Sequence, residues 1–575
     1  MGKRRAIAAP KHPSFLAGLA PSLILLAAWS AMTVVTNPIG DFPLNDDWAF
    51  GRPVKTLLEE GRVEFTGWMS MTLIAQVLWG ALFGWPFGFS FTALRISTLT
   101  LGFVGIWSTY GLLREAGADR RTATFGALLV AVCPLYFALS HTFMTDVPFF
   151  AVGMLALWLF ARGLRRDRAV EWVAAVGLMC IAVLIRQFGF ALAVTFAFGL
   201  AVRYGRTRRS IALATIPIIA SALCYGAFMM WLKSGPGVPE LYGAQYPSPA
   251  SLFTLDFWFR AAFNLATIPL YVGLFLGPWL LFLPSPPITL RGSAAWQAAA
   301  TFLMGAIVEL VLSVTAIDTV VPRLMPLRGN VFINFGIGPA LLHDTYFLNL
   351  PNHPRAPLWI WTLVTLASLV GAVRLFRYAG LNFAGLPAVF RRADSLHHEW
   401  FHVVIAVCAT LYCLLLLIAP RFDRYVIFLL PLVMILVARV QRASPGSLNS
   451  SNPAAARRVA IAWLGLLLFG WFSIAGTHDY LAWNRVRWNT LRQLLADGTI
   501  TSKTIDAGVE FHGWYDYRDR HLAEVGKSWW WVEDDGYILT LGPVSGYQNI
   551  REYPYSRWLP GPEGRLYLMR RRTKS

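Results

Sequence analysis

Residues 13–50 read PSFLAGLAPSLILLAAWSAMTVVTNPIGDFPLNDDWAF, an apolar run that leads into a pair of adjacent carboxylates. Residues 15–35 carry no charged side chain and match the ~20 apolar residues that cross a bilayer as a helix. Basic residues precede the run, and no clear small-residue cleavage site follows it. We therefore predict an uncleaved first span with a cytoplasmic N-terminus, which places Asp46-Asp47 on the outer face.

The composition of the whole chain extends this prediction from one span to many. Of its 575 residues, 56% are hydrophobic and only 14% are charged, against roughly a quarter charged in soluble domains. This composition excludes a soluble enzyme, a disordered chain and a fibrous repeat, and it indicates a polytopic α-helical membrane protein. We attribute the net charge of +19 to basic residues on cytoplasmic loops and not to nucleic-acid binding.

Apolar runs that are candidates for bilayer spans recur along the chain. With residues 15–35 they predict about 13 transmembrane helices. The further runs lie near residues 91–113, 123–141, 147–162, 170–186, 188–203, 211–232, 261–283, 298–317, 357–376, 401–419, 425–439 and 459–477. Residues 71–88 are also apolar, but a span there would place the next arginine clusters outside. The positive-inside rule therefore favours an interfacial helix at 71–88 and a short helical hairpin over 170–203.

The chain divides into two predicted domains. Residues 1–477 form the transmembrane domain, with a large first outer loop at about 36–90 that carries interfacial helices. Residues 478–575 contain many aromatic residues and strand-like runs, which predict a small α/β domain outside the membrane. The cysteines all fall within apolar runs, which indicates packing roles and not disulfides. They are Cys133, Cys180, Cys224, Cys408 and Cys413.

Polar residues that could carry chemistry lie at the ends of predicted spans, where a charge beside hydrocarbon is costly and therefore informative. On the predicted outer face are Asn45-Asp46-Asp47, Asp146 in a very short loop, and Arg421-Phe422-Asp423-Arg424-Tyr425 between two late spans. Arg186 lies at the tip of the short hairpin. Because all four positions face one side, we expect them to act together.

Each position also has a structural interpretation. Asp46-Asp47 and Asp146 could cap the helices that follow them, Arg186 could be a snorkelling residue, and the late arginines could be interface anchors. As a group, however, carboxylates can take a proton from a hydroxyl or bind a divalent cation, and arginines can hold a phosphate. This combination suits a substrate with an anionic head and a lipid tail, and it indicates group transfer from a lipid-linked phosphate.

The order of these motifs resembles the GT-C glycosyltransferases. The most similar group is the glycosyltransferase family 39 type, which includes protein O-mannosyltransferases and bacterial aminoarabinose-lipid A transferases. The resemblance spans most of residues 15–477. The segments that carry it are NDDWAF (45–50), HTFMTDVPF (141–149), IRQFG (185–189) and RFDRYVIFLLP (421–431). These segments are short, so the specificity of the resemblance comes from their order and predicted topology.

The resemblance implies a GT-C-like fold, a polyprenyl-phosphate sugar donor, inversion at the anomeric carbon, and a site on the outer face of the bacterial inner membrane. The acceptor is a hydroxyl of a lipid, a glycan or a protein. No organic cofactor is implied, and a divalent metal ion is an open requirement. Asp46 is the implied general base, with Asp47 beside it, and Asp146 matches the second acid. The candidates for binding the donor phosphate are Arg186, Arg424, Tyr425 and, as a weaker match, Arg421.

Two features depart from the family pattern or extend it. Asp46-Asp47 stands where many relatives have Asp-Glu. In residues 478–575, exposed aromatic side chains could stack on sugars and polar side chains could line a subsite. Those polar side chains are Glu510, His512, Glu533, Asp534 and Asp535. A small packed domain with an ordinary aromatic core is the favoured interpretation of this segment.

Two other functions stay open at this point. A transporter or flippase for a lipid-linked sugar would place polar residues near the midplane of the membrane. The predicted spans are largely free of acidic residues, and Glu309 is an exception. An O-antigen ligase or polymerase would use a diphosphate-linked donor. Its usual signature is a set of arginines and a histidine in a large late loop. The loop at 318–356 does contain such residues, namely Arg323, Arg328, His343, His353 and Arg355.

Overall fold

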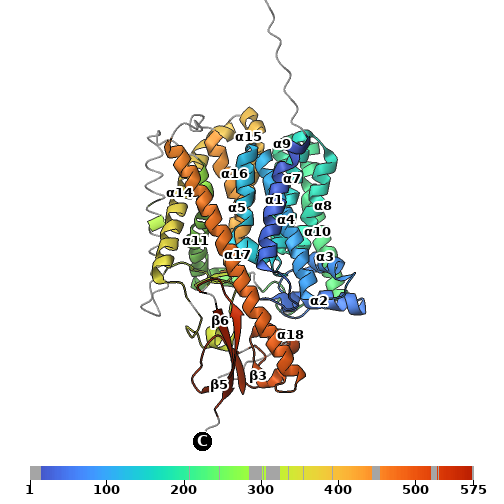
Figure 1. The fold of residues 1–575 in the computed structure, drawn as a ribbon. Coiled ribbons are helices and arrows are strands. Elements are labelled where there is room, and N and C mark those ends of the chain that lie inside the picture. Colours follow the sequence, from blue (N-terminus) through green and yellow to red (C-terminus); the bar gives the residue numbers. More distant parts are fainter. Residues whose placement is uncertain are drawn as a thin grey trace, which may run out of the picture.

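The computed structural model has two parts, a bundle of long helices and a β-sheet at one end of that bundle (Figure 1). We call this end of the bundle the sheet end. The structure describes residues 15–572 except 206, 245–246, 284–300, 302–303, 306–323, 335, 354, 392, 443–452, 520–527, 529 and 562.

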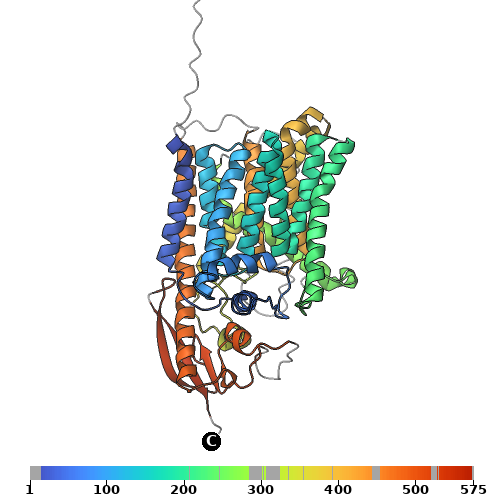
Figure 2. The ribbon, with the colours of Figure 1, turned by 90° about the vertical axis from the view of Figure 1, so that its right-hand side faces the viewer.

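Most of the helices run along one common direction (Figures 1 and 2). They are α1 (Phe15–Thr36), α4 (Phe91–Glu115), α5 (Arg120–Ala131), α7 (Asp146–Arg166), α8 (Ala169–Ile185), α9 (Phe190–Tyr204), α10 (Arg208–Ser234), α11 (Leu255–Phe275), α14 (Leu358–Arg391), α15 (Ala393–Ile418), α16 (Leu429–Arg442) and α17 (Pro453–Ala496). Two short helices, α6 (Pro134–Ser140) and α12 (Gly277–Phe282), follow α5 and α11. The helices α2 (Asp47–Glu60) and α3 (Ile74–Gly84) lie crosswise at the sheet end (Figure 2).

Within the described part of the chain, eight helices are long and apolar enough to cross a membrane, or nine if the bent pair α5 and α6 counts as one span. The predicted count of 13 is therefore not confirmed. The predicted runs at 170–186 and 425–439 are helices α8 and α16, which have only 17 and 14 residues. The run at 261–283 is divided between α11 and α12. Most of the run at 298–317 lies outside the described residues.

Local sequence explains two of the breaks between helices. Pro134 is the first residue of α6, and because proline lacks an N–H and clashes with the preceding turn, α5 ends there and the chain bends by 62°. The chain turns at Arg186–Gly189 between α8 and α9, which confirms the predicted hairpin over 170–203. The predicted interfacial segment 71–88 contains the short crosswise helix α3.

Small residues let α11 and α14 pack closely. A side chain at Gly273 would overlap the backbone of α14, and a side chain at Gly371 would overlap the backbone of α11. Glycine at both positions therefore permits an approach that no larger residue allows, as is usual where membrane helices pack tightly. This contact fixes α11, which lines a groove described below.

The sheet has the strand order β3-β4-β6-β5. The short strand β3 (Ile505–Asp506) pairs in parallel with β4 (Tyr537–Thr540), while β4 with β6 (Glu563–Arg571) and β6 with β5 (Tyr547–Ser556) are antiparallel. The helix α18 (Val509–Tyr515) follows β3 directly, so residues 505–571 form a small mixed unit, which we call the sheet unit. A separate hairpin of β1 (Phe332–Ile333) and β2 (Gly336–Ile337) lies in the late loop.

The sheet unit shares its core with the bundle and its loops. The helix α17 runs without a break from Pro453 to Ala496, so the predicted domain boundary at residue 478 falls inside a helix. Phe42 of the first outer loop and Leu342 of the late loop pack in the same apolar cluster as Leu568 of β6. These shared contacts hold the sheet unit against the loops that carry the predicted site.

Candidate active site

The predicted acid Asp146 lies in a buried ion cluster at the sheet end. It is the first residue of α7 and only 3% of its surface is exposed. Its Oδ1 accepts a hydrogen bond of 2.6 Å from Nη1 of Arg186, in the turn between α8 and α9. Its Oδ2 lies 3.6 Å from Nε of Arg424, in the loop before α16. One carboxylate thus faces two guanidinium groups, and the cluster carries an excess of positive charge.

The two arginines of this cluster have hydrogen-bonding capacity to spare. Both lie against the ring of Tyr425, whose centroid is 4.6 Å from the guanidinium carbon of Arg186 and 5.5 Å from that of Arg424. Nε of each arginine is buried without a hydrogen-bond partner in the part of the chain that the structure describes. Because buried donors without acceptors are costly, the arrangement is suited to an anion that accepts from both groups.

The surroundings of Arg424 keep its guanidinium group protonated. Burial lowers the pKa of this guanidinium and is the largest single effect, but Asp146, Tyr425 and Asp46 together outweigh it, so the pKa is raised. Nη1 of Arg424 also donates to Oδ1 of Asn330 at 3.1 Å, which brings the late loop to the cluster. Arg424 is therefore a fixed cation at the point where three segments distant in sequence meet.

Asp46 lies next to this cluster, at the start of α2. It is half-buried, and its Oδ1 accepts a hydrogen bond of 3.0 Å from the indole Nε1 of Trp68. Burial raises the pKa of Asp46 above its usual range, whereas Arg424 and the Trp68 hydrogen bond oppose this rise. A reachable carboxylate with a raised pKa is the kind of group that acts as a general base.

Asp47 has a different environment from its neighbour. It is 2% exposed, and its two oxygens accept hydrogen bonds from the backbone amides of Phe143 at 2.7 Å and Leu44 at 3.2 Å. Burial raises its pKa to about 8 even though Arg95 lies nearby. Both oxygens are thus engaged by backbone amides, and the carboxylate ties the first outer loop to the segment before α7.

The two remaining charged residues of the late motif lie apart from the cluster. The carboxylate of Asp423 accepts hydrogen bonds from the backbone amides of Val331 and Phe332, at 3.0 Å and 2.7 Å from Oδ2. It thereby fixes β1 beside Arg424. Arg421 is exposed, and its guanidinium carbon lies 5.1 Å from the ring centroid of Phe263. Of the predicted arginines, the structure brings Arg186 and Arg424 to Asp146, but not Arg421.

Some residues of the site carry no signal in the sequence. Asn330 and Trp68 are residue types found throughout the chain, and only the fold shows that they contact Arg424 and Asp46. Arg95 is different, because it is a lone cation near the start of an apolar run. It is 1% exposed and donates to four backbone carbonyls that clamp the first outer loop to the segment before α7. The acceptors are those of Pro38, Gly40, Phe42 and His141.

An apolar groove begins beside Arg186. It has a volume of about 690 Å³ and is bordered by α9, α11 and α15, with Gln187 and Phe188 at the hairpin turn. Apart from Gln187, the side chains that line it are apolar. Its members from the helices include Val194, Trp258, Ala261, Leu414 and Ile418. An apolar groove of this size can accommodate a hydrocarbon chain.

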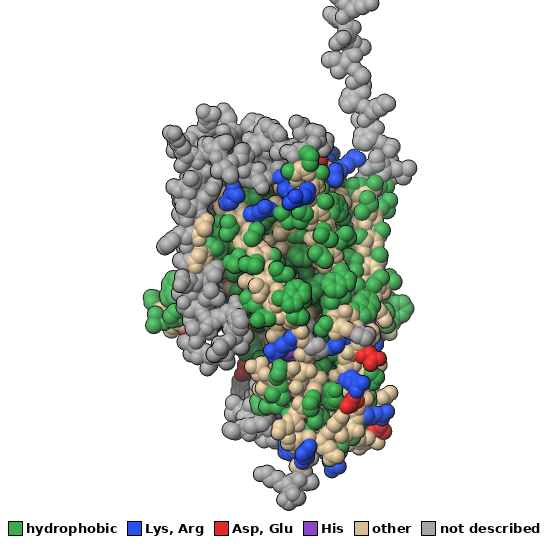
Figure 3. All heavy atoms as spheres, turned by 60° about the vertical axis from the view of Figure 1, so that its left-hand side comes forward, with side chains coloured by type: hydrophobic (Ala, Val, Ile, Leu, Met, Phe, Trp, Pro, Cys, Tyr) green, Lys and Arg blue, Asp and Glu red, His purple; other side chains and the backbone are tan. Residues whose placement is uncertain are grey.

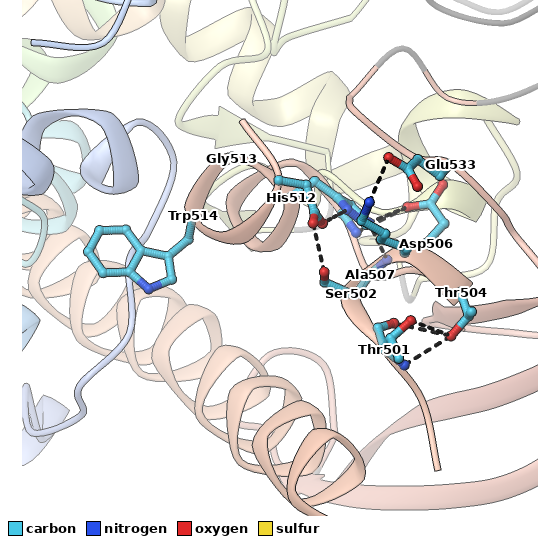
Figure 4. Close-up of polar contacts among 12 residues, drawn as sticks. Thr501, Ser502, Thr504, Asp506, Ala507, His512, Gly513, Trp514 and Glu533 are labelled. Carbon is cyan, nitrogen blue, oxygen red and sulfur yellow. Dashed lines mark hydrogen bonds and ion pairs between the residues drawn. The ribbon is translucent and has the colours of Figure 1, made fainter. Parts of the chain in front are cut away.

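The polar residues of the sheet unit form a packed network (Figure 4). His512 and Asp516 are hydrogen-bonded at 3.0 Å, and Ser502 donates to the other oxygen of Asp516 at 2.7 Å. The Asp506 carboxylate is 2.8 Å from Nδ1 of His343 in the late loop. Glu510, fully buried, is paired with an arginine of α17 at 3.0 Å. These contacts agree with the interpretation of a packed unit and leave Glu510 and His512 unavailable to a ligand.

A metal-binding set is not apparent at the site. Among the described residues, no group of three or more His, Cys, Asp or Glu side chains is arranged to hold a metal ion. At the ion cluster, Asp146 is engaged by two arginines, and this donor set fits an anion better than a cation. We therefore derive no step through a metal.

The profile of one protein family matches part of this chain. It is the family of dolichyl-phosphate-mannose-protein mannosyltransferases, and the match covers residues 78–232. This segment includes Asp146 and Arg186 but not Asp46 or Arg424. The match confirms the resemblance to membrane glycosyltransferases of the family 39 type over these residues. No curated protein sequence matches the chain.

Solved structures of three glycosyltransferases also match this chain. The apo oligosaccharyltransferase of Archaeoglobus fulgidus has 16% identity and a TM-score of 0.41, with 81% of this chain and 57% of that chain covered. ArnT from Cupriavidus metallidurans bound to undecaprenyl phosphate has 13% identity and a TM-score of 0.39, with 97% and 98% covered. Arabinosyltransferase EmbB from Mycobacterium smegmatis has 13% identity and a TM-score of 0.32, with 85% and 44% covered. This chain thus spans 57% of the length of the oligosaccharyltransferase.

Proposed function

We propose that this protein is a membrane glycosyltransferase that transfers a sugar from a polyprenyl-phosphate donor to an acceptor hydroxyl. The observation that carries the proposal is the buried cluster of Asp146, Arg186 and Arg424, with Asp46 beside it and an apolar groove that begins next to Arg186. A lipid-phosphate donor requires an anion site that continues into an apolar groove, and a hydroxyl acceptor requires a base. The three features lie together at the sheet end.

The donor phosphate binds between the two arginines in this proposal. Their unpartnered Nε atoms donate to its oxygens, and Tyr425 keeps both guanidinium groups in place. The polyprenyl chain follows the groove along α9, α11 and α15. In this arrangement the lipid chain enters the groove at Gln187, the residue that follows Arg186 in the hairpin turn. Arg421, which lies apart, takes no part in this arrangement.

Asp46 is the proposed base for the acceptor. It takes the proton of the acceptor hydroxyl while the oxygen forms a bond to the anomeric carbon of the sugar. The bond between that carbon and the phosphate oxygen breaks, and the electron pair leaves with the polyprenyl phosphate. Arg186 and Arg424 stabilise the negative charge that develops on the leaving group. Attack opposite to the leaving group inverts the anomeric carbon, and the half-buried Asp46 then releases its proton to water.

The distribution of basic residues supports a site on the outer face of a bacterial inner membrane. On the face shown in Figure 3, the charged side chains at the end away from the sheet are mainly Lys and Arg, whereas the sheet unit carries both Lys or Arg and Asp or Glu. A mainly apolar belt separates the two ends. The helix α7 starts at Asp146 in the site and ends at Arg165 and Arg166, which marks the opposite end. By the positive-inside rule the arginine-rich end faces the cytoplasm, so the site and the sheet unit face outward.

The alternative functions receive less support. A transporter is expected to hold its polar residues near the middle of the bundle, whereas the charged cluster lies at one end; Glu309 is outside the described residues. For a diphosphate-using ligase, the late loop would supply arginine and histidine. Here Arg328 is engaged by Thr267 at 2.8 Å and Asn264 at 3.0 Å, and His343 by the sheet unit. Arg323 is outside the described residues.

The proposal can be tested with purified protein, a radiolabelled polyprenyl-phosphate sugar and a membrane lipid extract that supplies acceptors. We expect wild-type protein to move label into a new product and folded Asp46→Asn protein not to. Wild-type turnover by folded Asp46→Asn protein would exclude the assigned base. Label that crosses proteoliposome membranes without a new product would indicate a transporter. Label transferred only from diphosphate-linked donors would indicate a ligase. The same assay repeated in the presence of EDTA tests for a metal requirement.

A further inference from the structure

The sheet unit contacts the first outer loop immediately beside Asp46. The carboxylate of Glu510 in α18 faces the backbone amide of Asn45, the residue before the proposed base. Gly513 lies so close to the ring of Trp48 that any side chain there would overlap it. Arg52 of α2 donates to the backbone carbonyl of Gly513 at 3.1 Å. The helix α18 is therefore fixed against α2, which begins directly after the base.

A second set of contacts holds the turn that carries Trp68. The carboxylate of Asp519 accepts a hydrogen bond of 3.2 Å from the backbone amide of Gly67. The ring of Trp531 meets the ring of Trp68 edge-on at 5.7 Å and the ring of Trp48 edge-on at 5.4 Å. Edge-to-face contacts of this kind fix the relative orientation of aromatic rings. The segment that follows α18 therefore supports the indole whose N–H donates to Asp46.

Trp531 adopts an unusual backbone conformation to make these contacts. Its φ of 61° lies in the left-handed region, which a bulky side chain rarely adopts. It is 4% exposed, and its Nε1 donates to the carbonyl of Arg518 at 2.9 Å. A sparsely populated backbone conformation persists only where the surrounding structure imposes it, and such positions cluster at functional sites. The conformation of Trp531 thus points to a role beyond filling the core.

We propose that Trp531 is a positioning residue for the proposed base, because it holds Trp68 in the orientation in which the indole N–H donates to Asp46. The inference rests on the proposed function, since it takes Asp46 as the base. Trp531 acts through Trp68 and Trp48. Through Trp531, the sheet unit then supplies the support for a hydrogen bond to the base.

This role has a consequence that simple packing does not have. A hydrogen bond to the ionised form of a carboxylate lowers its pKa. If Trp68 moves away, the pKa of Asp46 rises and less of the carboxylate is ionised at a given pH. The low-pH limb of the rate profile then shifts toward higher pH. The donor groove, which Trp68 does not line, is not altered.

The experiment compares four variants of the full-length protein in detergent. Trp68→Phe removes only the donor, Trp531→Ala removes the support, and Trp531→Phe is a milder change in case the alanine variant does not fold. Trp530→Ala is the matched control, because Trp530 is equally buried in the same turn and packs on Tyr346 at 4.7 Å. We expect the first two variants to lower kcat on the order of tenfold, with KM for the donor within about twofold. In these two variants the low-pH limb of the rate profile shifts to higher pH, and Trp531→Phe gives a smaller shift in the same direction.

The control separates positioning from stability. Trp530→Ala should lower the unfolding temperature without moving the pH profile. A folded Trp531 variant that keeps the wild-type kcat and pH profile overturns the proposal. A shift of equal size in Trp530→Ala also overturns it, because any damage to the turn would then have the same effect.

A second measurement does not depend on catalysis. In an Asp46→Cys protein, the pH dependence of alkylation by iodoacetamide gives the pKa of the thiol at this position. Adding Trp68→Phe or Trp531→Phe should raise that pKa, and adding Trp530→Ala should not. An unchanged thiol pKa overturns the positioning role. If the thiol pKa shifts but wild-type protein transfers no sugar, the proposed function fails and the positioning of residue 46 stands.

Discussion

Nη1 of Arg186 lies 2.6 Å from Oδ1 of Asp146, and both side chains are almost fully buried. The two residues come from different parts of the bundle, one from the turn between α8 and α9 and the other from the start of α7. Their contact therefore joins the hairpin to the rest of the site. It also means that each residue affects stability as well as chemistry, and the two effects can be separated experimentally.

Removing one partner of this pair should destabilise the protein more than removing both. Asp146→Asn leaves two buried guanidinium groups without their counter-charge, and breaking a buried pair costs about 3–5 kcal/mol. We expect Asp146→Asn to lower the free energy of unfolding by about 3 kcal/mol and Asp146→Asn/Arg186→Met to regain part of this loss. Thermal unfolding of the single and double variants in detergent measures the coupling. Strictly additive effects would show that the pair is not coupled in the folded protein.

The two arginines of the late motif should behave differently. Arg424 is buried beside Asp146, whereas Arg421 is exposed over Phe263. We expect Arg424→Gln to raise KM for the donor by at least about tenfold, since a charged hydrogen bond contributes about 1.5–3 kcal/mol. Arg421→Gln, the matched change at the exposed position, should stay within about twofold of wild type. Steady-state kinetics over a range of donor concentrations distinguishes them, and equal losses would place both arginines at the donor.

Asp46 and Asp47 are adjacent and chemically identical, but the structure separates their roles. Asp46→Asn should lower turnover by about 10²–10⁴-fold and leave the unfolding temperature nearly unchanged. Asp47→Asn should unfold at a lower temperature, because one of two buried backbone amides loses its acceptor at a cost of about 1–3 kcal/mol. Activity and thermal unfolding are measured on the same preparations. The opposite pattern would exchange the two assignments.

The pH dependence of turnover follows from the raised pKa of Asp46. A base works only when ionised, so the rate should rise with pH as Asp46 loses its proton. Burial raises its pKa above the usual 3.8, so the midpoint of this limb should lie above that value. Asp46→Glu should retain a limb of the same sign, and Asp46→Asn should lose it. A rate that falls over this pH range would show that the proposed base must be protonated, which contradicts the mechanism.

Much of the bundle could be predicted from the sequence, because long apolar runs are needed to satisfy the backbone in a membrane. The run predicted at 91–113 corresponds to α4 at Phe91–Glu115. The apolar runs at 170–186 and 188–203, together with the placement of arginines, predict the short hairpin. The run at 459–477, in contrast, is only the middle of α17. Hydropathy detects the part of a helix that lies in lipid, and it cannot detect a polar continuation beyond the membrane surface.

The site could be predicted in part for a similar reason. Asp146, Arg186 and Arg424 stand out because charges beside hydrocarbon are rare, and their common side follows from topology. The contacts of Trp68 and Asn330 could not be predicted, because neither residue type is unusual and both partners are distant in sequence. The different surroundings of Asp46 and Asp47 depend on where α2 begins and which residue faces the backbone of Phe143. Only the packed structure determines this.

The apolar groove leads to a prediction about the lipid part of the donor. Val194 of α9 lines the groove and is 45% exposed. A tryptophan at this position would occupy space that the proposal gives to the polyprenyl chain. Overpacking an apolar site costs about 1–3 kcal/mol, so Val194→Trp should raise KM for a long-chain donor by about tenfold and leave kcat nearly unchanged. A water-soluble donor with a very short chain should be affected much less, because its lipid part ends before it reaches Val194.

The matched control for this change is a tryptophan on a helix surface outside the groove. Leu223 of α10 is 68% exposed and has the apolar surroundings expected of a lipid-facing residue. Leu223→Trp should leave KM unchanged for both long-chain and short-chain donors. If Val194→Trp and Leu223→Trp raise KM equally, the effect comes from the bilayer and not from the groove. If neither changes KM while both proteins fold and turn over, the donor chain does not lie along α9, and the anion cluster alone would determine donor binding.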